Sequence, residues 1–191
     1  MAVNITVAGV SYSVPSSAAD VNWAAQQLAF EQALAAQGNT SVQRLYANSV
    51  PVGTGLDNTE DTLMSYTLPA GALSTAAKCL RVTAWGTGAN VSQTTTLRAY
   101  FGATKLLEAS LGTGQPNTWR VQYECLAVGA SSQAASLLYF NGEADSWVYL
   151  PASPAETAAS QILLKFTGQK ASPGTTANAV VQVGMTVELI P

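Results

Sequence analysis

From Thr62 onward the chain consists of short runs in which apolar residues alternate with polar ones, separated by clusters of Gly, Pro, Ser and Asn. The run "TTTLRAYF" is typical, because Leu97, Ala99 and Phe101 fall on one face of a strand. Alternation with a period of two indicates half-buried β-strands, and no stretch of helical period interrupts the series. About eight or nine such runs predict a mainly β protein with an antiparallel sandwich, and eight strands suit a jelly roll.

The first fifty residues follow a different pattern. Two alternating runs on either side of Ala8-Gly9 predict a β-hairpin over residues 3–14. The stretch "VNWAAQQLAFEQALAAQGN" then has apolar residues at helical spacing, which predicts one amphipathic helix over residues 17–37. A polar passage with a short strand near Val42 to Tyr46 joins this part to the body. We therefore expect an N-terminal arm over residues 1–50 and a jelly-roll sandwich over residues 51–191.

The arm needs something to lie against. A lone two-stranded hairpin is marginally stable in water, and so is an isolated helix with one apolar face. We expect its apolar side chains to contact other subunits, although packing of the helix on its own sandwich is the alternative. The expected interface residues are Val3, Ile5, Val7, Tyr12, Trp23, Phe30 and Leu34.

Charged residues are scarce, and histidine is absent. The chain has 8 Lys and Arg against 11 Asp and Glu, so its net charge of −3 offers no basic field to a nucleic acid. The lack of His removes the commonest general base and the commonest metal ligand. The apolar runs are shorter than the roughly 20 residues of a membrane span. We expect no enzymatic activity, no cofactor, no metal, and neither nucleic acid nor membrane as a partner.

Two groups of carboxylates are alternatives to that expectation. "DNTED" places Asp57, Glu60 and Asp61 within five residues, and Ca²⁺ is the cation that such oxygens bind. The loop lacks the glycine and the distal Glu of an EF-hand. Glu143 and Asp145 in "NGEADSW" would form the acid and base of a glycoside hydrolase only if they lined a cleft.

The two cysteines are predicted to be free thiols. Cys125 falls on the inward face of its run with Val121 and Tyr123, whereas Cys79 falls with Arg81 on an outward face. A disulfide needs its two Cβ atoms about 4 Å apart, which opposite facings prevent. No basic region followed by an apolar run opens the chain, so we expect synthesis in a reducing compartment.

Three stretches resemble a β-sandwich module found in virion proteins of tailed bacteriophages. They are "GTGLDNTEDTLMSYTLPAGAL", "LRVTAWGTGANVSQTTTLRAYFGATKLLE" and "ILLKFTGQKASPGTTANAVVQVGMTVELIP". The resemblance covers roughly residues 50 to 191. The opening "NITVAGVSYSVPSSAADVNWAAQ" is similar to an N-terminal segment common in phage fibre and decoration proteins.

The resemblance implies a jelly-roll body, a homotrimer and a structural role in the virion, without catalytic residues. Fibre proteins usually carry a long central shaft that this chain lacks, which favours a capsid decoration (cement) protein bound to the major capsid protein. The alternative is a tail-fibre or receptor-binding protein that recognises the host surface. The chain would be made in the host cytoplasm and located on the virion, at the capsid surface rather than the tail.

Overall fold

The computed structural model describes residues 3–7, 10–14, 42–74, 78–89, 93–112, 117–142, 146–174 and 176–191. The chain divides into two units, residues 1–42 with Pro191 and residues 43–190. In the first unit the expected hairpin is present: β1 (Val3–Val7) pairs antiparallel with β2 (Val10–Val14), and Ile5 lies opposite Tyr12. The helix predicted over residues 17–37 lies outside the described residues.

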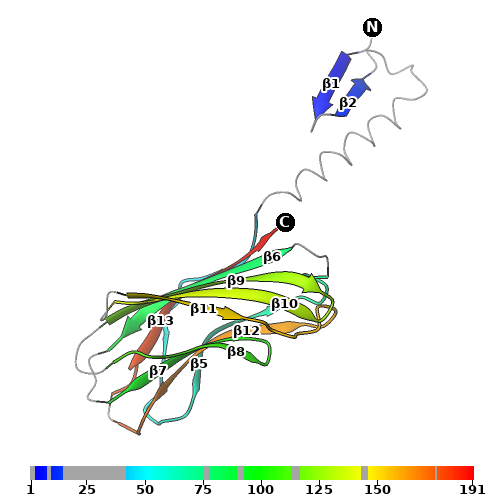
Figure 1. The fold of residues 1–191 in the computed structure, drawn as a ribbon. Helices are drawn as coiled ribbons and strands as arrows, with labels where there is room; N and C mark the ends of the chain where they lie inside the picture. Colours follow the sequence, from blue (N-terminus) through cyan, green and yellow to red (C-terminus); the bar gives the residue numbers. More distant parts are fainter. Residues whose placement is uncertain are drawn as a thin grey trace. The chain divides into compact units, whose positions relative to one another are not determined.

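The described part of the second unit is built from strands β3 to β13 (Figure 1). Their bounds are β3 Gln43–Asn48, β4 Val52–Gly53, β5 Asp61–Leu68, β6 Cys79–Gly88, β7 Thr95–Phe101, β8 Thr104–Ser110, β9 Asn117–Gly129, β10 Ser132–Asn141, β11 Ser146–Ala152, β12 Ile162–Lys170 and β13 Val180–Ile190. No helix among the described residues has the length and hydropathy that a bilayer span requires.

These strands form two antiparallel sheets that face each other across one core (Figure 1). The larger sheet has the order β11-β10-β9-β6-β13-β3, with β4 also paired to β13, and the smaller has the order β5-β12-β7-β8. The predicted antiparallel β-sandwich is therefore confirmed.

The strand order is that of a jelly roll. The hairpin β7–β8 is the innermost of four nested antiparallel pairs, and the others are β6 with β9, β5 with β12, and β3 with β13. Such nesting arises when a long folded ribbon of paired strands wraps into two sheets. The hairpin β10–β11 is an addition that widens the larger sheet beyond β9.

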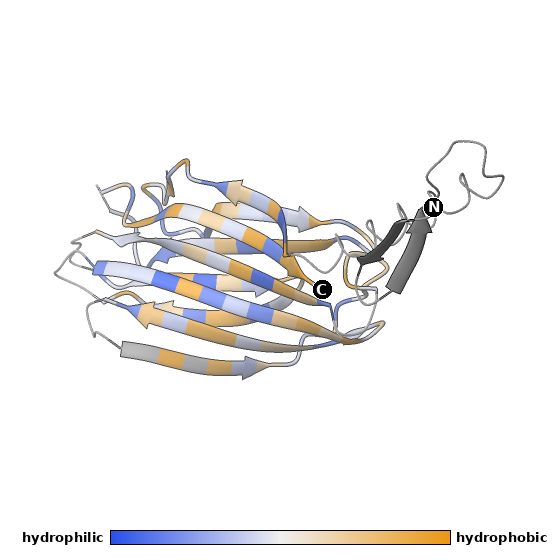
Figure 2. Ribbon diagram, turned by 90° about the horizontal axis from the view of Figure 1, so that it is seen from above, coloured by the Kyte–Doolittle hydropathy of each residue, from blue (hydrophilic) through white to orange (hydrophobic). Residues whose placement is uncertain are grey.

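Side chains alternate between core and surface as the period-two pattern predicts. Along β9, Trp119, Val121, Tyr123 and Cys125 are buried, whereas Arg120 between them is exposed. Figure 2 shows the same alternation as orange and blue segments along the strands of the larger sheet. The inward residues of both sheets fill the core. One face of each sheet is therefore covered, and the opposite face is the outer face.

The larger sheet includes residues that the sequence pattern assigned to the arm. Strand β3 pairs with β13, with Asn48 opposite Met185 and Gln43 opposite Leu189. Leu45 packs against the core. The boundary between the two units along the chain therefore lies before Gln43, earlier than the boundary expected after residue 50.

Candidate functional site

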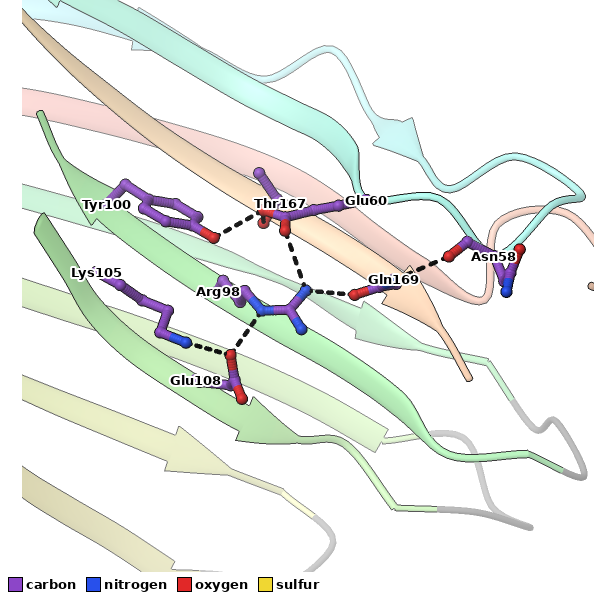
Figure 3. Close-up of polar contacts among 8 residues, drawn as sticks. All are labelled: Asn58, Glu60, Arg98, Tyr100, Lys105, Glu108, Thr167 and Gln169. Carbon is purple, nitrogen blue, oxygen red and sulfur yellow. Dashed lines mark hydrogen bonds and ion pairs between the residues drawn. The ribbon is translucent and has the colours of Figure 1, made fainter. Parts of the chain in front are cut away.

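The outer face of the smaller sheet carries a closed polar network, drawn in Figure 3. Arg98 lies at its centre: its Nε donates to Glu108 Oε2 at 2.8 Å, and its Nη1 donates to Gln169 Oε1 at 2.6 Å. The same Nη1 lies 3.3 Å from Glu60 Oε2. Lys105 Nζ donates to Glu108 Oε2 at 2.5 Å. Each charged group of this network thus has an opposite charge beside it.

Glu60 connects this network to β7 and to β12. Its Oε1 accepts hydrogen bonds from Tyr100 Oη at 2.8 Å and from Thr167 Oγ1 at 2.7 Å. Partial burial alone would raise the pKa of Glu60, but these hydrogen bonds and the nearby Arg98 outweigh it and lower the pKa. The groups that could bind a ligand are already bound to one another, so this face is a structural cross-link.

The fold gives the three carboxylates of the acidic loop considered for calcium separate partners. Asp57 Oδ1 accepts from Thr59 N at 3.1 Å and Thr59 Oγ1 at 2.7 Å, while Asp61 Oδ2 accepts from Gly55 N at 2.8 Å. Glu60 belongs to the network on the smaller sheet. Within the described ranges, no three Cys, Asp or Glu side chains gather as metal ligands.

The other residues singled out from the sequence are placed as follows. Glu143 and Asp145 lie outside the described residues, and so do Trp23, Phe30 and Leu34. Val3, Ile5, Val7 and Tyr12 lie on the N-terminal hairpin, in the register given above.

The outer face of the larger sheet is organised around Trp85. This residue on β6 lies opposite Gly184 on β13. A Cβ atom placed on Gly184 would be 2.2 Å from Cζ2 of the indole, 2.6 Å from Cε2 and 2.7 Å from Cη2. The ring therefore lies across the space that a side chain at position 184 would fill. Gly184 is buried beneath it, while 36% of Trp85 remains exposed.

A β-bulge puts the glycine in that position. The register between β13 and β6 shifts between Gln182 and Gly184. Gln182 is completely buried on the inner face, and Gly184 comes to lie opposite Trp85 on the outer one. Bulges re-aim side chains and are over-represented beside functional sites.

Beside Trp85 the outer face is hollowed, with a volume of about 510 Å³. We call this surface the Trp85 face. It is formed by outward residues of three adjacent strands: Arg81, Thr83 and Trp85 of β6, Arg120 and Gln122 of β9, and Thr186 and Glu188 of β13. A second hollow of about 440 Å³ lies next to it, lined by residues that include Cys79, Glu124 and Leu126.

The polar groups of the Trp85 face are only partly engaged. Arg81 forms an ion pair with Glu124, since its Nε and Nη2 both lie 2.8 Å from Glu124 Oε1. By contrast, the side chains of Arg120, Gln122 and Thr186 have no hydrogen bond or ion pair with any described residue. Unlike the smaller sheet, this face retains donors and acceptors for a ligand.

Both cysteines are free, as the facing of their strands predicted. Cys125 lies opposite Leu80 in the core, whereas Cys79 lies opposite Leu126 on the outer face. Burial raises the pKa of the Cys125 thiol to about 12 and also raises the pKa of Cys79. Neither thiol is therefore a thiolate at neutral pH, and neither forms a nucleophilic site.

The Trp85 face was not predicted from the sequence. Its residues lie far apart in the chain and meet only because β6 pairs with both β9 and β13. One signal was available: in "CLRVTAW", Trp85 occupies the outward set with Arg81 and Thr83. A large aromatic residue on the polar side of a strand indicates a contact surface.

No protein-family model and no curated protein sequence matches the chain. Several solved structures are similar in outline. The lectin UEA-II complexed with galactose shares 7% identity over 81% of this chain and 94% of that one, with a TM-score of 0.44. The CBM2 module of the evolved Dit of Lactobacillus casei BL23 phage J-1 shares 10% identity over 81% of this chain and 84% of that one, with a TM-score of 0.31. The structure of infectious bursal disease virus, Gx strain, shares 12% identity over 78% of this chain and 33% of that one, with a TM-score of 0.30. At these scores the likeness says nothing about what this chain binds.

Proposed function

We propose that the chain is a structural subunit of a phage particle whose sandwich recognises carbohydrate through the Trp85 face. The observation that carries the proposal is the indole held across Gly184 beside side chains that have no hydrogen-bond or ion-pair partner among the described residues. The resemblance of residues 50–191 to phage virion modules is the reason for assigning the chain to a phage particle. Of the two roles that the resemblance implies, recognition of a host surface is the one that this geometry favours.

The chemistry of a sugar matches the face. A pyranose ring presents a flat patch of C–H groups and a rim of hydroxyl groups. The indole of Trp85 supplies a large apolar surface for the C–H groups. Arg120 donates hydrogen bonds, while Gln122 and Thr186 both donate and accept them, so together they suit hydroxyl groups. A hollow of about 510 Å³ lies within the usual range of small-ligand sites.

The proposal assigns no catalysis to this face. Of its two neighbouring carboxylates, Glu124 is paired with Arg81 at 2.8 Å, and Glu188 Oε1 lies 3.8 Å from Arg44 Nη2. Both carboxylates thus have a guanidinium of the protein beside them, whereas a glycoside hydrolase needs a carboxylic acid that donates its proton to the leaving group. Binding without turnover is the expected behaviour.

The second candidate is a trimeric cement protein that binds the major capsid protein. It is favoured by four exposed aliphatic side chains on β9, β10 and β11, namely Leu126, Val128, Leu138 and Val148. Apolar residues at a surface with few charges suit burial against protein. In this role the arm residues expected at subunit interfaces would hold the trimer or meet the shell.

Binding of the full chain to host-surface polysaccharide tests the recognition role. Trp85→Ala should reduce binding at least tenfold, because the stacking surface is lost. Leu163→Ala is the matched control, since Leu163 is 42% exposed but lies on the smaller sheet. Equal binding by both variants, or none by the unaltered chain, would contradict the role.

Imaging of labelled particles separates the two candidates. Density at the tail supports recognition of the host, whereas density spaced regularly over the head supports cement.

A further inference from the structure

We infer that the carbohydrate bound by the Trp85 face is acidic, and that its anionic group pairs with Arg120. The inference rests on the proposed function and adds the class of ligand. It comes from the distribution of charge around the indole and from the position of Arg120 relative to it.

Arg120 differs from the other arginines of the chain. Arg98 has two carboxylates within 3.3 Å, Arg81 has Glu124 at 2.8 Å, and Arg44 has a carboxylate at 3.8 Å. No carboxylate of the described residues lies within ion-pair distance of Arg120, which is exposed. Among the described residues, the other charges of this face form opposite pairs, Arg81 with Glu124 and Arg44 with Glu188. None of them cancels the positive charge of Arg120 beside Trp85, although the whole chain carries −3.

The register places that charge where it would meet a stacked sugar. Arg120 lies directly opposite Trp85 on the neighbouring strand β9, and both point to the outer face. Directly opposite residues of antiparallel strands have Cβ atoms about 5 Å apart. The indole itself lies across Gly184, on the β13 side of β6, so a substituent that projects from a stacked ring toward β9 would meet the guanidinium.

A guanidinium is suited to an anion rather than to hydroxyl groups alone. Its planar set of N–H groups binds a carboxylate or a phosphate through two parallel hydrogen bonds. An exposed lysine at the same position would hold the charge without that geometry. The side chains of Gln122 and Thr186 remain available for the hydroxyl groups of the same ring.

The test compares sugars that differ only in charge. Calorimetric titration of the full chain would use an oligosaccharide that contains glucuronic acid, the same oligosaccharide with glucose in its place, and a glucose 6-phosphate form. We expect at least one acidic form to bind about tenfold more tightly than the neutral one, and salt to weaken that preference. Whichever acidic form is preferred shows whether the anion is a carboxylate or a phosphate.

Variants then assign the preference to its residue. Arg120→Gln should make the acidic and neutral sugars bind equally to that variant, while Arg120→Lys should keep part of the preference. Lys165→Gln is the control for net charge, because Lys165 lies over the ring of Tyr100 on the smaller sheet. Circular dichroism of each variant checks the fold.

The outcomes separate this inference from the proposed function. If neutral and acidic sugars bind equally, and Trp85→Ala abolishes both, the inference is overturned and carbohydrate recognition stands. If Lys165→Gln lowers acidic binding as much as Arg120→Gln does, the preference belongs to net charge and the inference fails. If no sugar binds, both proposals fail.

Discussion

The indole of Trp85 occupies the space where a side chain of Gly184 would stand, with Cζ2 2.2 Å from the position of a Cβ atom. The opposite face of the same sheet has a second pair of this kind. There, a Cβ atom placed on Gly86 would lie 2.5 Å from Cζ2 of buried Trp119. The same Cβ atom would lie 2.0 Å from the carbonyl oxygen of Val181. The three heavy atoms nearest to a methyl group at position 184 belong to the surface side chain of Trp85, whereas a methyl group at position 86 meets backbone and core.

We predict that Gly184→Ala weakens sugar binding with little loss of stability, because the exposed indole can move aside. Gly86→Ala should lower the free energy of unfolding by about 1–3 kcal/mol or more, since the core cannot yield. Urea unfolding and sugar titration measure the two effects. Gly55→Ala is the neutral control, because its Cβ would lie 3.7 Å from the nearest atom. Equal destabilisation at positions 184 and 86 would contradict the geometry.

Two tyrosines should respond in opposite ways to loss of the hydroxyl group. The Tyr123 hydroxyl is buried and has no hydrogen-bond partner in the described structure, whereas Tyr100 donates to Glu60 at 2.8 Å. An unpaired buried hydroxyl costs about 1–3 kcal/mol. Tyr123→Phe should therefore maintain or raise the unfolding free energy, while Tyr100→Phe should lower it by at most about 1 kcal/mol. A marked loss on Tyr123→Phe would reveal a partner for that hydroxyl.

The network on the smaller sheet makes stability depend on acid pH. The Lys105 ammonium and then the Arg98 guanidinium lower the pKa of Glu108 from 4.5 to about 2. A carboxylate whose pKa is lower in the folded chain stabilises the fold above its unfolded pKa, and this contribution disappears as the pH falls from about 4.5 to 2. Glu108→Gln should flatten that part of the profile. Unfolding midpoints across this range measure the slope, and an unchanged slope would refute the assignment.

The position of β3 predicts where the chain can be shortened. A chain that begins at Gln43 keeps the β3–β13 pairing and should melt cooperatively at the temperature of the full chain. One that begins at Ser49 loses Leu45 from the edge of the core and exposes β13, so it should melt lower and aggregate. If the chain from Gln43 also melts lower, the first 42 residues stabilise the sandwich.

The same pair of chains tests the expected interface of the arm. Sedimentation of the full chain and of the chain from Gln43 compares their oligomeric states. A trimer that becomes a monomer on removal of residues 1–42 would support subunit contacts through residues such as Trp23 and Phe30. A trimer in both would exclude the arm as its cause.

The sandwich and its core were predictable because a strand with one buried face has an apolar residue at every second position. Val121, Tyr123 and Cys125 on β9 illustrate this, and the facing of Cys79 followed from the same rule. The short strand expected near Val42 to Tyr46 is present as β3, but its pairing with β13 was not predicted, because its outward and edge positions resemble a polar linker.

The Trp85 face depends on relationships that no local pattern contains. Trp85, Arg120 and Gly184 become neighbours through two strand pairings and a bulge that shifts register by one residue. The acidic loop shows the converse. Asp57 and Asp61 are close in sequence, but each carboxylate accepts hydrogen bonds from a different nearby donor once the loop turns.

The nested pairing also sets an order of events during synthesis. Strand β6 is complete at Gly88, but its neighbour β13 begins only at Val180, after six other strands have left the ribosome. The β7–β8 hairpin closes locally, and each outer pair must close a longer loop at a higher entropic cost. Until β13 inserts between β6 and β3, both of those strands present unpaired edges to any nascent chain nearby. Any delay in the release of β13 prolongs the time in which β6 can pair with the β6 strand of a neighbouring copy, so slower synthesis of this segment should increase aggregation.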